Sequence, residues 1–449
     1  MILTQKGSAS RTALVAALAA MLAVSGCGVF KGGHKKPKTL GERISVLDYE
    51  AQVEAEADLQ GVEVVLPEAH VNASWVQPSG NAAGAMGHLA LGGTLTRAWS
   101  VPIGKGSDAT RKLNATPVID ANKLFVMDTE ARVSAFDATT GARLWEKQIV
   151  RDGEDAHPAF GGGVSVMDGR VFATSGFGVV VAFDANTGAE LWRATLPTPL
   201  RGAPAVENGR VFVTTQDGQL TAYNAENGTN LWQANATVEP AAVMGPGAPA
   251  IAMDTVVAGF PSGELFALRV ENGRTVWQDQ LSRTGRTTAL GALSGIAASP
   301  VIDRGRVFAI SHGGRMAALE LATGQRVWER EFAGVQTPWI VGDWVFAVTV
   351  EGELVALTRG EGKIRWVTHL QRWKKEKKKK GATVEWAGPV LAGDRLILLS
   401  SLGHMVTVNP RTGEIISNTK MGKPAYLPPV VANGMLYILT DDGHLTAYR

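Results

Sequence analysis

The only thiol of the chain, Cys27, lies in a sequence that predicts covalent lipidation. Cys27 is the single cysteine among 449 residues, and it ends the run Val24-Ser25-Gly26-Cys27, which has the pattern of a bacterial lipobox. Cleavage by signal peptidase would leave this cysteine as a diacylated and then N-acylated first residue. Two or three acyl chains anchor a protein stably, because each buried methylene contributes roughly 0.8 kcal/mol. We therefore predict residues 1–26 to be a signal peptide and Cys27 to carry the lipid.

The residues before and after Cys27 indicate where the lipid would hold the protein. Lys6 and Arg11 precede an apolar stretch over residues 13–24, and twelve residues at about 1.5 Å each are too short to cross a hydrocarbon core of roughly 30 Å. A stretch of this length is typical of a signal peptide. Gly28 follows the cysteine in place of the aspartate that commonly retains lipoproteins at the inner membrane. We expect the mature protein on the outer membrane, facing the periplasm.

The other reactive side chains form no catalytic or metal-binding pattern. No two of the eight histidines have the His-x-x-x-His spacing of a zinc site, and the chain has no Gly-x-Ser-x-Gly motif and no phosphate-binding glycine loop. A net charge of +2 with 19% charged residues also argues against nucleic-acid binding. We therefore predict no catalytic residue, no metal, no cofactor and no nucleic-acid partner.

One short segment has a high density of positive charge. Its residues are Arg372, Trp373, Lys374, Lys375, Lys377, Lys378, Lys379 and Lys380. This basic segment could be a solvated loop tip. It could also contact an acidic partner or anionic lipid headgroups, which would stabilise the contact by about 1 kcal/mol per lysine. Trp373 would then anchor at the interface, or it could substitute for packing within the fold.

An internal repeat predicts the elements that must position these residues. The segment from Phe136 to Trp145 reads Phe-Asp-Ala-Thr-Thr-Gly-Ala-Arg-Leu-Trp, and Phe183 to Trp192 is nearly identical. Further copies end at Trp232, Trp277, Trp328 and Trp366, and a seventh, over residues 408–417, lacks the tryptophan. Successive tryptophans are 47, 40, 45, 51 and 38 residues apart. Self-similarity at this period indicates a propeller or another stacked array.

Each copy predicts four short strands. The third copy gives strands over residues 203–206, 209–215, 218–223 and 229–232, with alternating apolar residues rich in Val, Phe and Tyr. Asn208-Gly209 and Asp217-Gly218 fit hairpin turns in which both residues favour positive φ. Each tryptophan would then lie on the outermost strand of its blade and pack between neighbouring blades.

The two ends of the repeat array complement each other. Leu95 to Ser100 is a lone outer strand containing Trp99, and Trp99 lies 46 residues before Trp145. The segments from Pro429 to Tyr448 supply three strands without an outer one. Pairing these ends gives an all-β, eight-bladed propeller of four-stranded antiparallel blades over residues 91–449, in which closure hides the edge strands. Residues 27–90 remain as a lipidated tether and extension. The predicted blade-docking tryptophans are Trp99, Trp145, Trp192, Trp232, Trp277, Trp328 and Trp366.

The Ala-Phe-Asp-Ala-x-Thr-Gly-x-x-Leu-Trp repeat resembles the PQQ-type propeller repeat and covers nearly all of residues 95–449. Two eight-bladed groups share such repeats: quinoprotein dehydrogenases and the BamB family of outer-membrane assembly lipoproteins. The lipobox, the mature length and closure at Tyr448-Arg449 are similar to the BamB family. This resemblance implies a scaffold that binds the periplasmic domains of a BamA-type protein and aids insertion of β-barrel proteins.

Two other functions stay open at this stage. A dehydrogenase would need a calcium site of carboxylates and amides, a catalytic aspartate and usually a vicinal disulfide, but no cysteine follows Cys27. Aspartates such as Asp137 and Asp184 fit the repeat turns, where a side-chain oxygen accepts hydrogen bonds from the local backbone. A chaperone that binds unfolded outer-membrane proteins by strand addition or on a concave face is compatible with the same fold.

Two connections between repeats are long enough to hold a partner site. The resemblance places BamA contacts in the connections over residues 238–249 and 283–298, where it implies an arginine and acidic residues. This chain has Met244, Gly295 and Ala297 near those positions, so we expect a mostly apolar contact. The candidate partner-binding residues are Val243, Met244, Leu290 and Leu293. They could equally be ordinary loop residues tucked under a blade.

Overall fold

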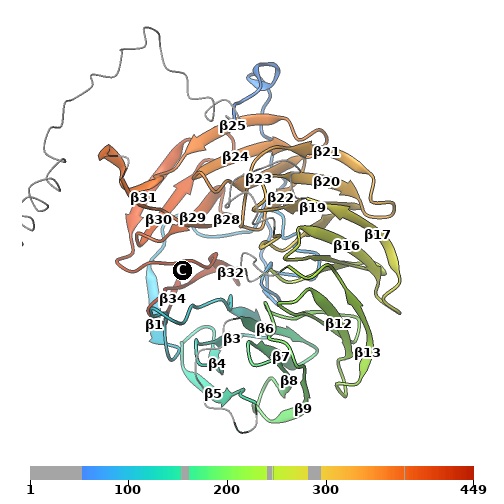
Figure 1. The fold of residues 1–449 in the computed structure, drawn as a ribbon. Coiled ribbons are helices and arrows are strands. Elements are labelled where there is room, and N and C mark those ends of the chain that lie inside the picture. The colour runs from blue at the N-terminus through green and yellow to red at the C-terminus, as the bar shows by residue number, and fades with distance from the viewer. Residues whose placement is uncertain are drawn as a thin grey trace, which may run out of the picture. The chain divides into compact units, whose positions relative to one another are not determined.

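Eight blades of four antiparallel strands surround a common axis (Figure 1). The computed structural model describes residues 53–151, 153, 161–239, 245, 247–281, 295–378 and 380–449. These residues contain no α-helix, only the 3-10 turns η1 (Ala57–Leu59) and η2 (Glu376–Lys378). None of the described helices is long and apolar enough to span a membrane. The prediction of an all-β, eight-bladed propeller is confirmed.

The strands of each blade run in chain order from the axis to the rim, except in the eighth blade. The innermost strands are β2 (Val118–Asp120), β6 (Gly162–Met167), β10 (Ala205–Glu207), β14 (Ala250–Ala252), β18 (Val301–Asp303), β22 (Trp339–Val341), β28 (Trp386–Ala392) and β32 (Val430–Ala432). The second strands are β3 (Lys123–Met127), β7 (Arg170–Ser175), β11 (Arg210–Thr214), β15 (Thr255–Gly259), β19 (Arg306–Ile310), β23 (Trp344–Val348), β29 (Arg395–Ser400) and β33 (Met435–Leu439).

The third strands are β4 (Arg132–Asp137), β8 (Val179–Asp184), β12 (Gln219–Asn224), β16 (Glu264–Arg269), β20 (Met316–Glu320), β24 (Glu353–Thr358), β30 (His404–Val408) and β34 (His444–Tyr448). The outermost strands are β5 (Arg143–Gln148), β9 (Glu190–Thr195), β13 (Asn230–Asn235), β17 (Thr275–Gln280), β21 (Arg326–Arg330), β25 (Ile364–His369), β31 (Ile415–Lys420) and β1 (Arg97–Pro102). A separate hairpin of β26 (Trp373–Lys375) and β27 (Lys380–Thr383) lies between the sixth and seventh blades.

The core lies between neighbouring blades. Third strands such as β12 are buried over four consecutive residues because a blade covers each face, whereas outermost strands such as β13 keep only the tryptophan buried. The turn Asn208–Gly209 has φ of 50° and 71°, as predicted. In the turn Asp217–Gly218 only the glycine has positive φ, so the prediction of two left-handed residues there was wrong. A turn of this kind needs the left-handed conformation at one position only.

Each outer-strand tryptophan joins its blade to the next one. The indole Nε1 donates to a backbone carbonyl of the following blade, and the ring covers the glycine of that blade's last turn. The donor–acceptor pairs are Trp99–Ala138, Trp145–Ala185, Trp192–Ala225, Trp232–Val270, Trp277–Leu321, Trp328–Arg359 and Trp366–Pro410, at 2.7–3.2 Å. A Cβ on the turn glycine would lie only 2.5–2.8 Å from the ring in every case. The repeat therefore encodes seven equivalent seams between blades.

The ring closes through β1, which pairs with β34 from Arg97↔Tyr448 to Pro102↔His444. Trp99 on β1 also carries the seam from the eighth blade to the first. The Ala138 carbonyl accepts from Trp99 Nε1 at 3.2 Å and from the Tyr437 hydroxyl at 3.2 Å. The closure predicted from the two ends of the array is thus confirmed.

The missing eighth tryptophan has a structural reason. Ser417 on β31 occupies its place, at the seam between the seventh and eighth blades. In the eighth blade the third and outermost strands, β34 and β1, come from opposite ends of the array, so no turn joins them. A tryptophan at position 417 would have no turn glycine to cover. Ser417 instead exchanges a hydroxyl hydrogen bond of 2.7 Å with Thr407.

The described part of the predicted extension packs on the blades. Residues 53–69 begin at the rims of the fifth and sixth blades. The Glu56 amide donates to Ile364 of β25, and the Glu56 carboxylate pairs with Arg330 of β21 at 2.9 Å. Asp58 pairs with Lys363 at 2.9 Å. Residues 27–52, with Cys27, lie outside the described residues.

Candidate functional site

Residues 70–90 form a closed loop at the axis, which we call the axial clamp. Its two ends pair with each other: the His70 amide donates to the His88 carbonyl at 3.0 Å, and the Ala90 amide donates to His70 at 2.7 Å. Trp75 pairs with Ile119 of β2 through two backbone hydrogen bonds of 2.7 Å, and its side chain is buried. The clamp therefore belongs to the propeller body rather than to a separate tether.

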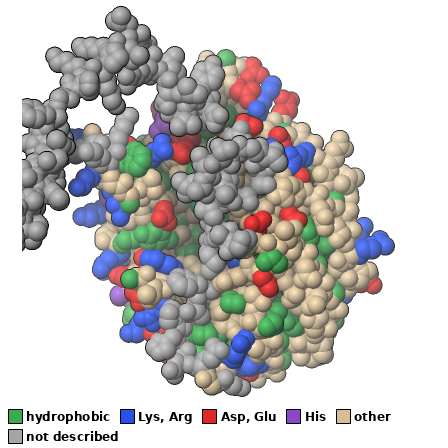
Figure 2. All heavy atoms as spheres, viewed as in Figure 1, with side chains coloured by type: hydrophobic (Ala, Val, Ile, Leu, Met, Phe, Trp, Pro, Cys, Tyr) green, Lys and Arg blue, Asp and Glu red, His purple; other side chains and the backbone are tan. Residues whose placement is uncertain are grey.

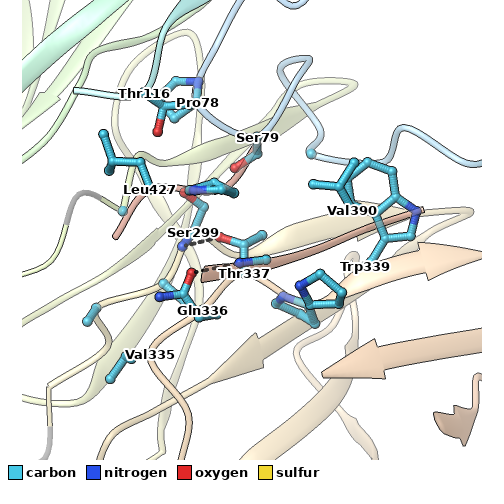
Figure 3. A pocket seen from close by; sticks show the side chains of 18 of the residues that line it. Pro78, Ser79, Thr116, Ser299, Val335, Gln336, Thr337, Trp339, Val390 and Leu427 are labelled. Carbon is cyan, nitrogen blue, oxygen red and sulfur yellow. Dashed lines mark hydrogen bonds between the residues drawn. The ribbon is translucent and has the colours of Figure 1, made fainter. Parts of the chain in front are cut away.

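A small cavity lies on one side of the clamp, and we call it the axial pocket (Figure 3). Its volume is about 130 Å³. Trp75, Pro78 and Ser79 of the clamp line it together with residues that precede the innermost strands of several blades. Trp75 and Trp339 stack with ring centroids 6.3 Å apart. Figure 3 shows Ser299 beside Thr337, and the Ser299 amide donates to the Thr337 hydroxyl at 3.1 Å.

The axial pocket does not fit the quinone cofactor and calcium ion of the dehydrogenase alternative. None of the described residues that line it carries a charge, and Asn114 and Gln336 are its only amide side chains. A quinone with several carboxylates would need cationic partners there, and calcium would need carboxylate oxygens. Among the described residues, no group of three His, Cys, Asp or Glu side chains could hold a metal ion.

The aspartates of the repeat turns serve the backbone. Asp137 accepts hydrogen bonds from the amides of Thr139 and Thr140, at 3.0 and 2.8 Å, and from the Thr140 hydroxyl. Asp184 has the same arrangement with Thr187. Backbone hydrogen bonds from Thr140 and Thr187 are the largest cause that lowers the pKa of these two carboxyls. Both carboxylates are thus engaged by the backbone of their turns, as the sequence predicted.

A second cavity, of about 410 Å³, adjoins the axial pocket and shares four lining residues with it; we call it the outer cavity. His312, Glu385 and Trp386 contribute to its walls. Burial raises the pKa of Tyr426, which lines both cavities, and the nearby carboxylates of Glu385 and Asp441 add to that shift. The walls of this larger cavity thus carry the Glu385 carboxylate and the His312 imidazole, whereas none of the described residues that line the axial pocket is charged.

The four predicted partner-binding residues, Val243, Met244, Leu290 and Leu293, lie outside the described residues. The described residues within the two connections, 238–249 and 283–298, are in contact. A Cβ on Gly245 would lie 2.5 Å from Ala297 Cβ, and the Gly247 amide donates to the Ala297 carbonyl at 3.1 Å. The described parts of the two connections thus lie side by side, and Gly245 and Ala297 both line the outer cavity.

A buried arginine fixes the second of these segments. Arg201 is 4% exposed and donates to the carbonyls of Gly259, at 3.1 Å, and of Ile296. Burial lowers the pKa of Arg201 to about 10. No sequence pattern distinguished Arg201 from the other arginines, because its role depends on contacts across 58 and 95 residues of chain.

The basic segment forms a hairpin, β26–η2–β27, which we call the basic hairpin. Its root is ordered by side-chain contacts: Arg372 pairs with Glu351 and lies over the Trp373 ring at 5.1 Å, and Glu376 accepts from the Trp373 amide at 2.8 Å. Lys374, Lys375 and Lys377 are exposed. Lys379 and the side chains of Lys378 and Lys380 lie outside the described residues. On the face shown in Figure 2, acidic and basic side chains are interspersed.

The fold is an eight-bladed propeller of PQQ-type repeats. Residues 70–90 of the same chain, the axial clamp, lie at its axis. The family described as outer membrane protein assembly factor BamB matches residues 96–152, 129–368 and 370–449. The chain belongs to this family, as its repeat predicted.

Relatives in this family align over different lengths. The outer membrane protein assembly factor BamB of Escherichia coli K12 is 29% identical over 356 residues, which are 78% of this chain and 88% of the relative. The BamB of Salmonella typhimurium is 28% identical over 171 residues, which are 37% of this chain and 41% of the relative.

Solved structures share the architecture at lower identity. The crystal structure of BamB from Moraxella catarrhalis has a TM-score of 0.66 and 22% identity, and the match covers 79% of this chain and all of that one. A quinohemoprotein alcohol dehydrogenase from Comamonas testosteroni has a TM-score of 0.65 and 14% identity, with coverage of 85% and 81%. At these identities the matches show the fold alone, so they do not separate a scaffold from an enzyme.

Proposed function

We propose that the protein is a lipid-anchored assembly factor of the outer membrane, facing the periplasm, that acts as a scaffold for a BamA-type protein and aids insertion of β-barrel proteins. The match of the BamB family over residues 96–449 carries this proposal. The lipobox at Cys27 supports the anchor, because acylation of that cysteine would hold the mature chain on the membrane.

The axis supports a role in binding rather than catalysis. An enzyme of this fold would need charged groups around a central cofactor, but the axial pocket is uncharged and the clamp fills the space beside it. The repeat aspartates are occupied by turn hydrogen bonds. These features favour a non-enzymatic protein.

The partner surface is proposed at the two connections that contain Met244 and Leu293. Their described flanks, Gly245 and Ala297, touch each other, so side chains from both connections could form one patch. Apolar anchors at the centre of an interface can dominate its binding energy. We assign Val243, Met244, Leu290 and Leu293 to this patch.

The test is co-purification from the outer membrane. The chain with its lipobox intact is expressed, outer membranes are dissolved in mild detergent, and bound proteins are identified by mass spectrometry. A BamA-type protein should be recovered in stoichiometric amount. The double variant Met244→Asp, Leu293→Asp should lose it, because two buried carboxylates in an apolar contact are strongly unfavourable.

A matched control separates this effect from a general loss of fold. Met253 and Leu144 are exposed by 76% and 47% and lie on other surfaces. The double variant Met253→Asp, Leu144→Asp changes the same residue types and should keep the partner. If both double variants recover the partner equally, the assigned patch is wrong. If the unmodified chain recovers none and instead oxidises an alcohol with quinone and calcium, the scaffold role is wrong.

The basic hairpin is proposed to contact anionic lipid headgroups. It follows β25 of the sixth blade directly, and the Glu56 amide donates to Ile364 of the same strand. Three exposed lysines would contribute about 3 kcal/mol at an anionic surface, roughly a hundredfold in affinity.

Vesicle binding tests this contact. The mature chain with Cys27→Ser removes the anchor, and its binding to phosphatidylcholine vesicles is compared with and without phosphatidylglycerol at low salt. Lys374→Gln, Lys375→Gln, Lys377→Gln should abolish the preference for anionic vesicles. The control Lys112→Gln, Lys147→Gln, Lys420→Gln removes the same charge from exposed sites elsewhere. Equal loss in both triple variants would mean that general charge, not the hairpin, drives binding.

A further inference from the structure

The axial clamp touches the innermost strand of every blade. Around the ring from the eighth blade to the seventh, the contacts follow the order of the clamp sequence. They join Asn72 to Val431, Trp75 to Ile119, Val76 to Val166, Gln77 to Val206, Ala82 to Ile251, Ala83 to Ile302, Gly87 to Trp339 and Leu89 to Leu391. The partner belongs to the innermost strand in all eight cases. The clamp therefore makes one complete circuit of the axis.

These contacts satisfy strand edges that would otherwise face the channel. An innermost strand has a neighbour on one side only, so its outward N–H and C=O groups are free to pair with another polypeptide. Trp75 pairs with both groups of Ile119, and the carbonyls of Val76, Ala82 and Ala83 each accept from one innermost strand at 2.7–2.9 Å. Main-chain groups of this one segment thus hydrogen-bond the main chain of five innermost strands, β2, β6, β14, β18 and β28, and the Gly87 carbonyl accepts from the Trp339 indole on a sixth.

At two innermost strands, β10 and β32, an amide side chain of the clamp makes the hydrogen bonds that its main chain makes to other strands. Gln77 is 3% exposed; its Nε2 donates to the Val206 carbonyl at 2.7 Å and its Oε1 accepts from the Val206 amide at 3.3 Å. Asn72 Nδ2 donates to the Val431 carbonyl at 2.9 Å, and the Asn433 amide donates to the Asn72 carbonyl at 2.6 Å. An amide reproduces the donor and acceptor of a peptide group, so these side chains act as short strand mimics.

The composition of the clamp matches the site that it fills. Residues 70–90 contain no Asp, Glu, Lys or Arg, and eight of the 21 residues are Gly or Ala. The axial pocket beside it is also uncharged. On the other side a third cavity, of about 310 Å³, is lined by different clamp residues and by Asp303. The clamp therefore separates two cavities along the axis.

We propose that the axis is a binding site for an uncharged, extended polypeptide rich in small residues, occupied in cis by residues 70–90. The bound segment holds all eight inner edges at once, so it closes the ring at its axis as β1 closes it at the rim. A second polypeptide reaches these edges only when the clamp leaves them. This site is distinct from the apolar patch assigned to the BamA-type partner.

Occupancy in cis is tested with the segment itself in trans. The probe is a fluorescent synthetic peptide with the sequence of residues 70–90, and a scrambled peptide of the same composition is its control. The intact chain should bind the probe weakly, because the site is filled. The variant Asn72→Ala, Gln77→Ala weakens the clamp at two blades and should bind the probe at least tenfold more tightly. Equal binding by both chains, or no binding by the variant, would overturn the proposal.

Hydrogen exchange tests whether one segment couples all the blades, and it works with single variants if the double variant does not fold. Gln77→Ala should raise exchange in β32 of the eighth blade, and Asn72→Ala should raise it in β10 of the third blade, although neither residue touches the strand named. The control Thr368→Val removes a buried hydrogen bond to Gly413 at the rim and should leave β10 and β32 unchanged. Exchange that rises only beside each substitution would show that the clamp contacts are independent, and would overturn the proposal.

Discussion

The seam built around Trp192 gives the sharpest test of how the repeat stabilises the fold. Gly228 in the last turn of the third blade has φ of 70°, and a Cβ there would lie 2.5 Å from Trp192 Cε3. Gly209, in a different turn of the same blade, has φ of 71°, and a Cβ there would meet nothing within 4 Å. Replacing each glycine with alanine imposes the same backbone cost but only one of them displaces the indole.

The two substitutions should differ by an amount set by the indole. A left-handed alanine costs roughly 1–2 kcal/mol, and this applies to both variants. At Gly228 the added methyl group must also push Trp192 away from a site where it is 8% exposed and donates to Ala225 at 3.0 Å. Overpacking of a close-packed site costs typically 1–3 kcal/mol. We therefore expect Gly228→Ala to be about 2 kcal/mol less stable than Gly209→Ala.

Urea unfolding followed by circular dichroism measures this difference. The midpoints are compared at equal slope, because a change of slope would mean that the blades no longer unfold together. A double-mutant cycle with Trp192→Phe tests the cause: in that background Gly228→Ala should lose most of its extra cost, since the smaller ring leaves room for the methyl group. Equal midpoints for Gly228→Ala and Gly209→Ala, or an extra cost that persists in the Trp192→Phe background, would refute the seam as the source of stability.

Three further outcomes are expected. Burial, aided by Asp137, raises the pKa of Tyr437 to about 12, above its ordinary value of 10.0, so its contribution to stability is complete below pH 10 and is lost as the pH rises towards 12. Tyr437→Phe should make the free energy of unfolding depend less on pH between 10 and 12. An unchanged pH dependence would contradict the raised pKa of Tyr437. Arg201→Met should lower the free energy of unfolding by about 2 kcal/mol, measured with heat or urea, because the Ile296 carbonyl loses its charged donor. It should also weaken partner co-purification, since residue 296 is no longer held in place. If the Arg201→Met variant is as stable as the unmodified chain and recovers the partner equally, Arg201 does not position the connection. Ser417→Trp should give no gain in the urea midpoint despite restoring the repeat, and a stabilised variant would mean that an indole can dock without a turn glycine.

The sequence predicted the repeating part of the fold because the information there is local. Alternating apolar residues, turn glycines and a tryptophan at a fixed spacing specify a blade within about 45 residues. The pairing of β1 with β34 followed from counting strands at the two ends, since a lone strand and a three-stranded blade each leave an edge unpaired. The basic segment was recognised by its composition, but its hairpin shape was not, because lysine-rich sequences carry no strand period.

The axial clamp shows what only the tertiary structure decided. Residues 70–90 have no repeat and no regular apolar period, so the sequence placed them in an extension before the propeller. Their conformation is set by eight strand edges from residues 118–433, and no local preference could show that one segment meets them in order. Arg201 has the same character, since its acceptors, Gly259 and Ile296, lie 58 and 95 residues away along the chain. Local spacing determined the blades, whereas the contents of the axis depend on how the closed ring brings all eight of them together.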